Sequence, residues 1–132
     1  MLNFKAVYAS ELNIRSFRNI KNLQMNPSSG NFFEIPQDLP LNFELFQTVL
    51  SDVEISIERI ISTGQKTPDD QWLEQDKNEW VILLQGESEI SLPDGSVKIL
   101  RKGDYLHIPK NTRHRIIRTS AEPPCIWLAV HY

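Results

Sequence analysis

The stretch GDYLHIPKNTRH at residues 103–114 decides the fold class of this 132-residue chain. A short apolar strand lies between a glycine turn and the turn signal Pro-Lys-Asn, and His114 opens the strand that follows. Upstream, EWVILLQG at residues 79–86 has a related pattern, because Glu79 opens an apolar strand that ends in a glycine turn. Both stretches predict short strands joined by tight turns.

Further turn signals recur at a spacing of roughly 8 to 12 residues after Gly86, which is typical of antiparallel strands in a sandwich or barrel. Asp94-Gly95 lies between two alternating segments and predicts a hairpin, because glycine accepts the positive φ that such turns need. The run Asn-Pro-Ser-Ser-Gly marks a boundary near residue 30. We therefore expect one all-β domain over residues 31–132, preceded by a helical or irregular extension over residues 1–30.

One segment before the strands has a different period. Between Pro40 and Ser51 the apolar residues recur at spacings of three and four, which predicts one or two turns of amphipathic helix. From Val53 the period changes to two, with Ile55 and Ile57 following, which predicts a strand.

The two opening stretches resemble the two sequence motifs of the cupin superfamily. The spacing of residues 79–86 matches the end of the first motif, Glu, six residues, Gly, and Gly103, Pro109 and His114 match the frame of the second. The resemblance covers about residues 53–131. It implies a small single-domain cupin with an antiparallel jelly-roll β-barrel.

The chain also departs from the cupin motifs. The paired histidines of the first motif should fall within residues 72–75, which read Trp-Leu-Glu-Gln, and no histidine precedes His107. Asn111 takes the place of a glycine, because asparagine tolerates a left-handed backbone better than most residues. Arg118 takes the place of the final asparagine. These departures are similar to a subgroup of small cupins of mostly unassigned function.

The resemblance implies a metal site of three histidines and one glutamate, which would hold Fe, Mn, Ni or Zn. Here the matching set is reduced to His114, Glu79 and Gln75, and an amide oxygen is the weakest ligand of the three. His107 would add an imidazole if its side chain points inward, and the strand period leaves this open. The other interpretation of His114 and Glu79 is a hydrogen-bonded structural pair without metal.

The expected ligand pocket adds four side chains: Trp72, Tyr105, His107 and Arg113. Arg113 and the neighbouring Arg115 and Arg118 favour an anionic ligand, because a guanidinium pairs with carboxylate or phosphate at two points. The competing interpretation is that strand alternation leaves at least two of these arginines in water.

Two functions follow from these residues. In the first, a cytoplasmic cupin with a degenerate divalent metal site binds or transforms a small anionic metabolite in its barrel. In the second, a metal-free, non-catalytic cupin acts as a ligand sensor or dimeric assembly module. Whether the protein is an enzyme stays open. Cys125 is expected to pack as a small hydrophobe rather than act as a nucleophile, and His131 to lie on the surface or at an interface. The expected homodimer interface uses three apolar side chains: Trp80, Ile82 and Leu84. The alternative is that the N-terminal segment or the helix near Leu45 covers them.

Charge and length exclude other partners. The net charge is −3, but the first 24 residues hold four of the 14 basic residues and one of the 17 acidic ones, so the remainder carries −6. Nucleic acid is therefore not expected as a partner. No apolar run reaches the ~18 residues of a membrane span. Three interpretations of residues 1–24 stay open. They are a mitochondrial-type presequence, a translated stretch before a true start at Met25, or a short helix or edge strand docked on the barrel.

Overall fold

The computed structural model describes residues 27–132, and this part of the chain contains strands and no helix. The predicted helical or irregular extension lies outside the described residues up to position 26, and residues 27–44 form no regular element. The eight strands are β1 (Leu45–Ser51), β2 (Ser56–Ser62), β3 (Glu79–Gln85), β4 (Glu87–Ser91), β5 (Val97–Arg101), β6 (Tyr105–Ile108), β7 (Arg115–Thr119) and β8 (Cys125–His131).

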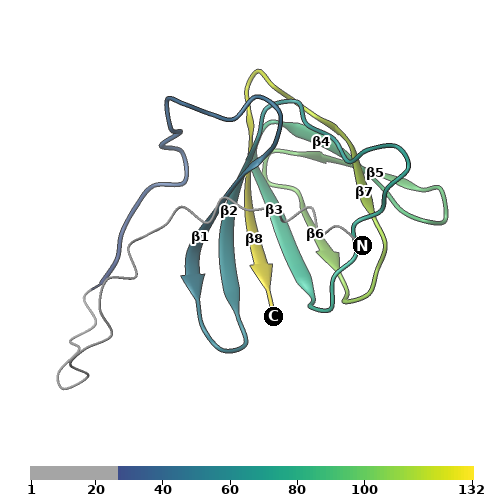
Figure 1. Ribbon diagram of the computed structural model, residues 1–132, viewed down its shortest axis with the longest axis horizontal. Helices are drawn as coiled ribbons and strands as arrows, with labels where there is room; N and C mark the ends of the chain where they lie inside the picture. The colour runs from purple at the N-terminus through teal and green to yellow at the C-terminus, as the bar shows by residue number, and fades with distance from the viewer. Residues whose placement is uncertain (1–26) are drawn as a thin grey trace.

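The strands form two antiparallel sheets that face each other (Figure 1). The larger has the order β1-β2-β8-β3-β6, and the smaller has the order β5-β4-β7. Val81, Leu83 and Trp127 of the larger sheet share one buried core with Ile90 and Leu100 of the smaller one. This arrangement confirms the predicted all-β jelly roll. Because the described residues include no helix, none of them forms a helix long and apolar enough to cross a membrane.

The predicted helix before Ser51 was wrong, because residues 45–51 form β1 and pair with β2. The register shifts between Thr48 and Leu50, so one extra residue interrupts the alternation of this strand. Such a bulge breaks the period of two and makes apolar spacings of three and four compatible with a strand. The strand predicted from Val53 also begins later, since Val53 is 90% exposed in the connection to β2.

The predicted turns agree with the structure. β4 and β5 form the hairpin around Asp94-Gly95, and Gly95 has φ 84°. Asn111 has φ 60°, as expected for an asparagine in the place of a glycine.

A segment without regular structure adds to the edge of the smaller sheet. Thr67 N–H donates to Ile116 O at 2.8 Å, and Leu73 and His114 exchange two backbone hydrogen bonds of 2.7 and 3.0 Å. Because Leu73 and His114 are bridge partners, their side chains lie on the same side of the sheet. That side faces the barrel interior. The interior site is built from this segment and the inner face of the larger sheet.

Candidate functional site

The polar part of the barrel interior lies at one end of the larger sheet. Glu79 of β3 and His131 of β8 are direct cross-strand partners. Val81 and Ala129, the next pair on the same face, belong to the buried core. Alternation along both strands therefore points Glu79 and His131 inward. The boundary between apolar core and polar interior falls between these two pairs.

Gln75 is joined to Glu79 directly. Its Nε2 donates a hydrogen bond of 2.6 Å to Glu79 Oε2, and its backbone oxygen accepts one of 2.7 Å from Asn111 N–H. The left-handed turn at Asn111 thus holds Gln75, and Gln75 fixes one carboxylate oxygen of Glu79. Gln75 and Glu79, both members of the predicted metal set, are thus in contact, but it is the amide N–H of Gln75, not its oxygen, that meets Glu79.

His131 belongs to this interior, so its predicted place at the surface or at an interface was wrong. It is 5% exposed, and its Nε2 lies 3.9 Å from Glu58 Oε1 of β2. His131 alternates with Trp127 and Ala129, which are core residues. Both faces of β8 are apolar in sequence, so only the packing of Trp127 and Ala129 into the core shows that His131 faces inward. Glu58, which the sequence analysis did not single out, is the second acidic group beside it.

A third carboxyl group comes from Glu44, just before β1. Glu44 Oε1 accepts a hydrogen bond of 2.7 Å from Ser62 Oγ, and Ser62 Oγ accepts one of 3.0 Å from Trp127 Nε1. Burial raises the pKa of Glu44 above its ordinary value; the Ser62 hydrogen bond opposes this rise, and the charge of Glu79 adds to it. Glu44 and Glu79 are therefore close enough in the interior for their charges to interact.

Replacement of Glu44 by glutamine is expected to stabilise the protein near pH 8 and much less near pH 5. A carboxyl group whose folded pKa is raised favours folding while it is protonated, and this contribution is lost as the pH rises through the folded pKa. Glutamine has the same shape, stays neutral and can still accept the Ser62 hydrogen bond. Thermal unfolding of both proteins across pH 5 to 8 measures the difference. An equal shift at all pH values would contradict the assigned pKa.

His114 also points inward and is 6% exposed, with Nδ1 3.0 Å from the backbone oxygen of Thr112. If Nδ1 carries the proton, Nε2 is left as an acceptor toward the interior. The predicted metal set nevertheless does not fit a metal centre. Within residues 27–132 no group of three or more His, Cys, Asp or Glu side chains is placed to hold an ion. Gln75 turns its Nε2 donor, not its amide oxygen, toward Glu79, so the predicted third ligand does not aim its oxygen at the carboxylate.

The four residues expected to line the pocket lie elsewhere. Tyr105 and His107 pair with Ile82 and Trp80, on the face opposite to Glu79, and Tyr105 is 64% exposed. The inward option for His107 is therefore not realised. Its Nε2 lies 3.1 Å from the hydroxyl of Tyr132, in the exposed layer outside the sheet.

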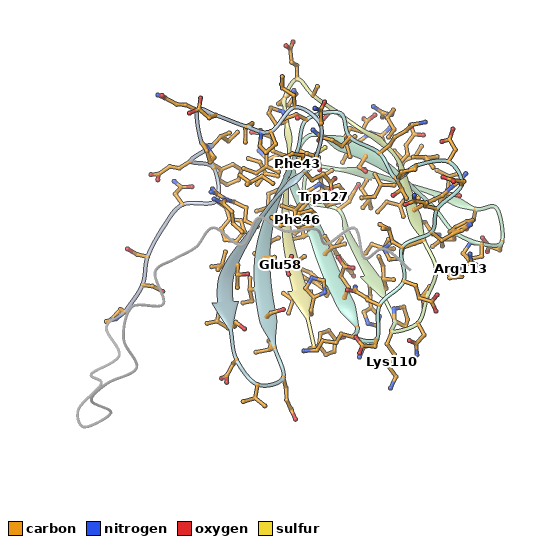
Figure 2. All side chains as sticks on the ribbon, in the orientation of Figure 1. Phe43, Phe46, Glu58, Lys110, Arg113 and Trp127 are labelled. Atoms are coloured by element: carbon orange, nitrogen blue, oxygen red, sulfur yellow. The ribbon has the colours of Figure 1, made fainter. Side chains whose placement is uncertain are left out.

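Trp72 and Arg113 lie on the outer side of the smaller sheet. Arg113 and Arg115 flank the inward-facing His114, so alternation turns both arginines outward. The guanidinium of Arg113 lies 5.4 Å from the centre of the Trp72 ring. Figure 2 shows Arg113 well separated from Glu58 of the interior.

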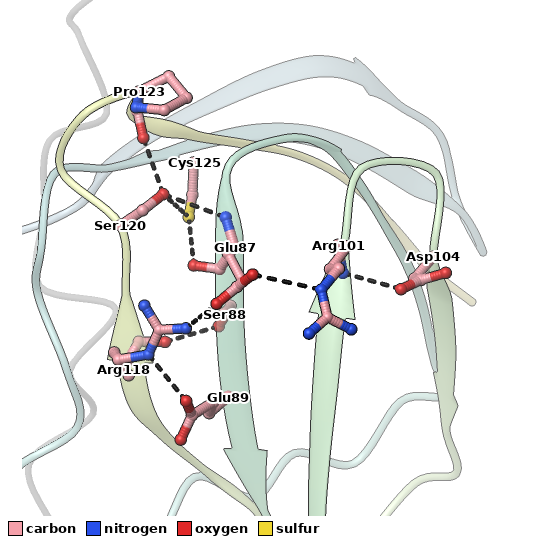
Figure 3. Close-up of polar contacts among 9 residues, drawn as sticks. All are labelled: Glu87, Ser88, Glu89, Arg101, Asp104, Arg118, Ser120, Pro123 and Cys125. Atoms are coloured by element: carbon pink, nitrogen blue, oxygen red, sulfur yellow. Dashed lines mark hydrogen bonds and ion pairs between the residues drawn. The ribbon is translucent and has the colours of Figure 1, made fainter.

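Arg118 is held on the same outer side by two acidic residues (Figure 3). Its Nε donates to Glu89 Oε1 at 2.8 Å, and its second nitrogen pairs with Glu87. Glu87 also pairs with Arg101 at 3.3 Å. Cys125 lies behind this network, fully buried, with its Sγ 3.3 Å from Glu87 O. Arg118 is thus a surface cation that two carboxylates neutralise.

Comparison with known proteins agrees with this architecture. A protein of Ralstonia eutropha JMP134, provisionally named a mannose-6-phosphate isomerase, is 39% identical; the match covers 80% of this chain and 97% of that one, with a TM-score of 0.71. An RmlC-like cupin protein of Desulfovibrio desulfuricans is 18% identical over 80% of this chain and 95% of its own, with a TM-score of 0.61, and shows the fold alone.

A curated relative matches a shorter region. The RCS-specific HTH-type transcriptional activator RclR of Escherichia coli (strain K12) is 34% identical over 47 residues, which are 36% of this chain and 16% of that protein. The chain thus spans far less than two thirds of this relative. The model of the cupin domain matches residues 60–131, more than half of the chain. Together with the 39% identical relative, this match shows that the chain belongs to the cupin domain family.

Proposed function

We propose that this cupin binds or transforms a small hydroxyl-rich molecule at the polar end of its barrel interior, as a cytoplasmic homodimer. The observation that supports the ligand class is the charge of the inner face of the larger sheet. Glu58 and Glu79 lie there beside His131, Glu44 reaches the same face, and no lysine or arginine occupies an inner position of these strands. Carboxylates are acceptors, so they favour a ligand that offers hydrogen-bond donors.

This proposal replaces the anionic ligand expected from the sequence. That expectation rested on the arginines near His114, and these point to the outer side of the smaller sheet. An anion beside Glu58 and Glu79 would meet like charges in a partly desolvated site, which is unfavourable. Hydroxyl groups meet acceptors there instead. The provisional name of the 39% identical relative, a mannose-6-phosphate isomerase, refers to a phosphorylated sugar, whose hydroxyl groups suit these acceptors and whose phosphate does not.

Metal chemistry is not part of the proposal, since the donors present do not fit a metal centre. Glu79, with one oxygen held by Gln75, keeps a second oxygen as an acceptor, and His131 and His114 add imidazole groups, which can donate and accept hydrogen bonds. These groups would support acid–base chemistry on a bound hydroxyl compound as well as plain binding. A turnover assay with the bound sugar separates an enzyme from a sensor.

Glu79→Gln is expected to weaken binding of a sugar by about 10- to 100-fold, because a hydrogen bond to a charged group contributes roughly 1.5–3 kcal/mol. Calorimetry with mannose and mannose 6-phosphate measures the effect. Arg118→Gln is the matched control, because it changes one charge on the outer side of the barrel. Wild-type binding of neither sugar, or equal binding by the Glu79→Gln protein, would overturn the proposal.

The homodimer is proposed to form through the outer face of the larger sheet. Trp80 pairs with Val130 and Ile82 with Leu128, and all four side chains stay partly exposed. Tyr105 extends this apolar layer and stacks on Trp80 with ring centres 5.6 Å apart. A partly exposed apolar face of this kind supports a protein interface there.

Ile82→Asp is expected to convert the dimer to a monomer, because it buries an unpaired charge in the proposed interface. Light scattering on the eluting protein measures the mass. Val97→Asp is the control: Val97 is also partly exposed, at 45%, but lies on β5 of the other sheet. A monomeric wild-type protein, or a dimeric Ile82→Asp protein, would contradict this interface.

A further inference from the structure

The outer side of the smaller sheet carries an arrangement that the interior site does not use. Two guanidinium groups lie over one indole ring: the central carbon of Arg113 is 5.4 Å, and that of Arg115 5.1 Å, from the centre of the Trp72 ring. Both contacts are within the range of cation–π attraction. The Trp72 ring therefore contacts two like charges.

The backbone register explains this clustering. Leu73 and His114 are bridge partners, so the residues before and after them on each segment lie side by side on the opposite face. Trp72 is thereby the cross-strand neighbour of Arg115, and Arg113 is one step along the same face. The cluster is fixed by the hydrogen bonds of the bridge and not by flexible surface side chains alone.

The acidic residues nearby leave these two arginines without an ion pair. The Asp69 carboxylate binds Lys66 Nζ at 2.9 Å, and Arg115 reaches only the backbone oxygen of Asp69. Lys66 and, to a smaller extent, Arg115 lower the pKa of Asp69. Among the described residues, no carboxylate, including the adjacent Asp70 and Glu74, forms a salt bridge with Arg113 or Arg115.

One donor in the cluster is also left unused. Arg115 Nε is buried and has no hydrogen-bond partner in the described part of the chain. A buried donor without an acceptor costs about 1–3 kcal/mol, more when the group is charged. A ligand whose negative charge lies beside the two guanidinium groups would reduce the repulsion between them.

We propose that Arg113, Arg115 and Trp72 form a binding site for an oxyanion, a phosphate or carboxylate group, on the outer side of the barrel. Two guanidinium forks match the paired oxygens of such a group. The site does not depend on the proposed function of the interior. The anion that the arginines in the sequence suggest would therefore bind on the outer side, away from the acidic inner face.

Arg118 provides the contrast within the same sheet. Its guanidinium is already engaged by Glu87 and Glu89, so it offers no free charge to an anion. Substitution of Arg118 removes the same formal charge from the protein as substitution of Arg113. The two variants therefore separate a built site from a general effect of net charge.

The test is a titration of nitrogen-15-labelled protein with sodium phosphate and, in a second arm, sodium acetate, with sodium chloride at equal ionic strength as the baseline. The signals of Trp72 Nε1–H and Arg115 Nε–H are expected to shift and saturate, while the indole signal of the buried Trp127 stays constant. The arm that saturates at lower concentration identifies the phosphate or the carboxylate source. Inorganic anions alone are used, so the result does not depend on sugar binding.

Arg113→Gln is expected to weaken binding of the anion by about 10-fold or more, as for a lost charge-assisted hydrogen bond. Arg118→Gln is expected to leave anion binding unchanged. Arg113 is exposed, so its replacement should not impair folding, which thermal unfolding of the variant checks. Shifts that follow ionic strength alike in all three salts would overturn the site. So would equal weakening by the two substitutions.

Discussion

Replacement of Gly86 by alanine is expected to lower the free energy of unfolding by about 3–5 kcal/mol, from left-handed strain and overpacking together. Gly86 is the single residue between β3 and β4 and turns the chain from one sheet to the other. Its φ is 91°, which favours glycine. A Cβ atom there would lie 2.9 Å from both Cα and Sγ of Cys125, and 2.7 Å from Ser120 Oγ. Because one of these atoms is backbone, rotation of side chains cannot relieve the contact.

Gly95→Ala is the matched control, since Gly95 has a similar φ of 84° but no atom within 4 Å of the added Cβ. Its expected effect is about 1–2 kcal/mol, the strain of the backbone alone. Chemical denaturation of the three proteins gives the two differences. Equal losses of unfolding free energy in the two variants would contradict the prediction. They would mean that the backbone around Gly86 shifts to make room for the added Cβ atom.

Replacement of Ser62 by alanine is expected to cost about 2–4 kcal/mol, because two hydrogen bonds are lost in the core and one involves a group that can be charged. Ser62 is fully buried, accepts from Trp127 Nε1 and donates to Glu44. Alanine leaves the indole N–H without its acceptor. Ser88→Ala is the control, because Ser88 is equally buried but makes one hydrogen bond, to the backbone oxygen of Arg118. That control should lose only about 1 kcal/mol.

The loss at Ser62 should also depend on pH. The Ser62 hydrogen bond lowers the pKa of Glu44, so its removal raises the folded pKa further. A raised carboxyl pKa costs stability once the pH exceeds it, so Ser62→Ala should be more destabilising at pH 8 than at pH 5. Ser88→Ala should show no such difference. Denaturation at the two pH values measures both effects, and a larger loss at pH 5 would show that the sign is wrong.

Local sequence was sufficient for the turns and for most of the strands. Asp94-Gly95 and Asn111 predicted their backbone conformations because positive φ is a property of single residues in short turns. The spacing from Glu79 to Gly86 predicted a strand and the corner after it. Gln75 and Glu79 were grouped by the spacing of the cupin motif, and their contact is local in sequence because only three residues separate them.

Positions that depend on which face is inward were harder to predict. Both faces of β8 are apolar, so the alternation did not decide between burial and exposure of His131. The structure decides it, since Trp127 and Ala129 of the same face join the core. The segment ending at Ser51 was predicted as helix because a bulge imitates a longer period. Only the pairing with β2 identifies it as a strand.

By itself, the sequence determined the all-β fold, the tight turns and the pair of Gln75 and Glu79, since each depends on residues that are near in the chain. The tertiary structure alone decided the chemistry around them. It turned Arg113 and Arg115 to the outer side and brought Glu44, Glu58 and His131 to the inner face beside Glu79. These groups come from strands far apart in the sequence, and their charges interact only because the sheet register places them on one face.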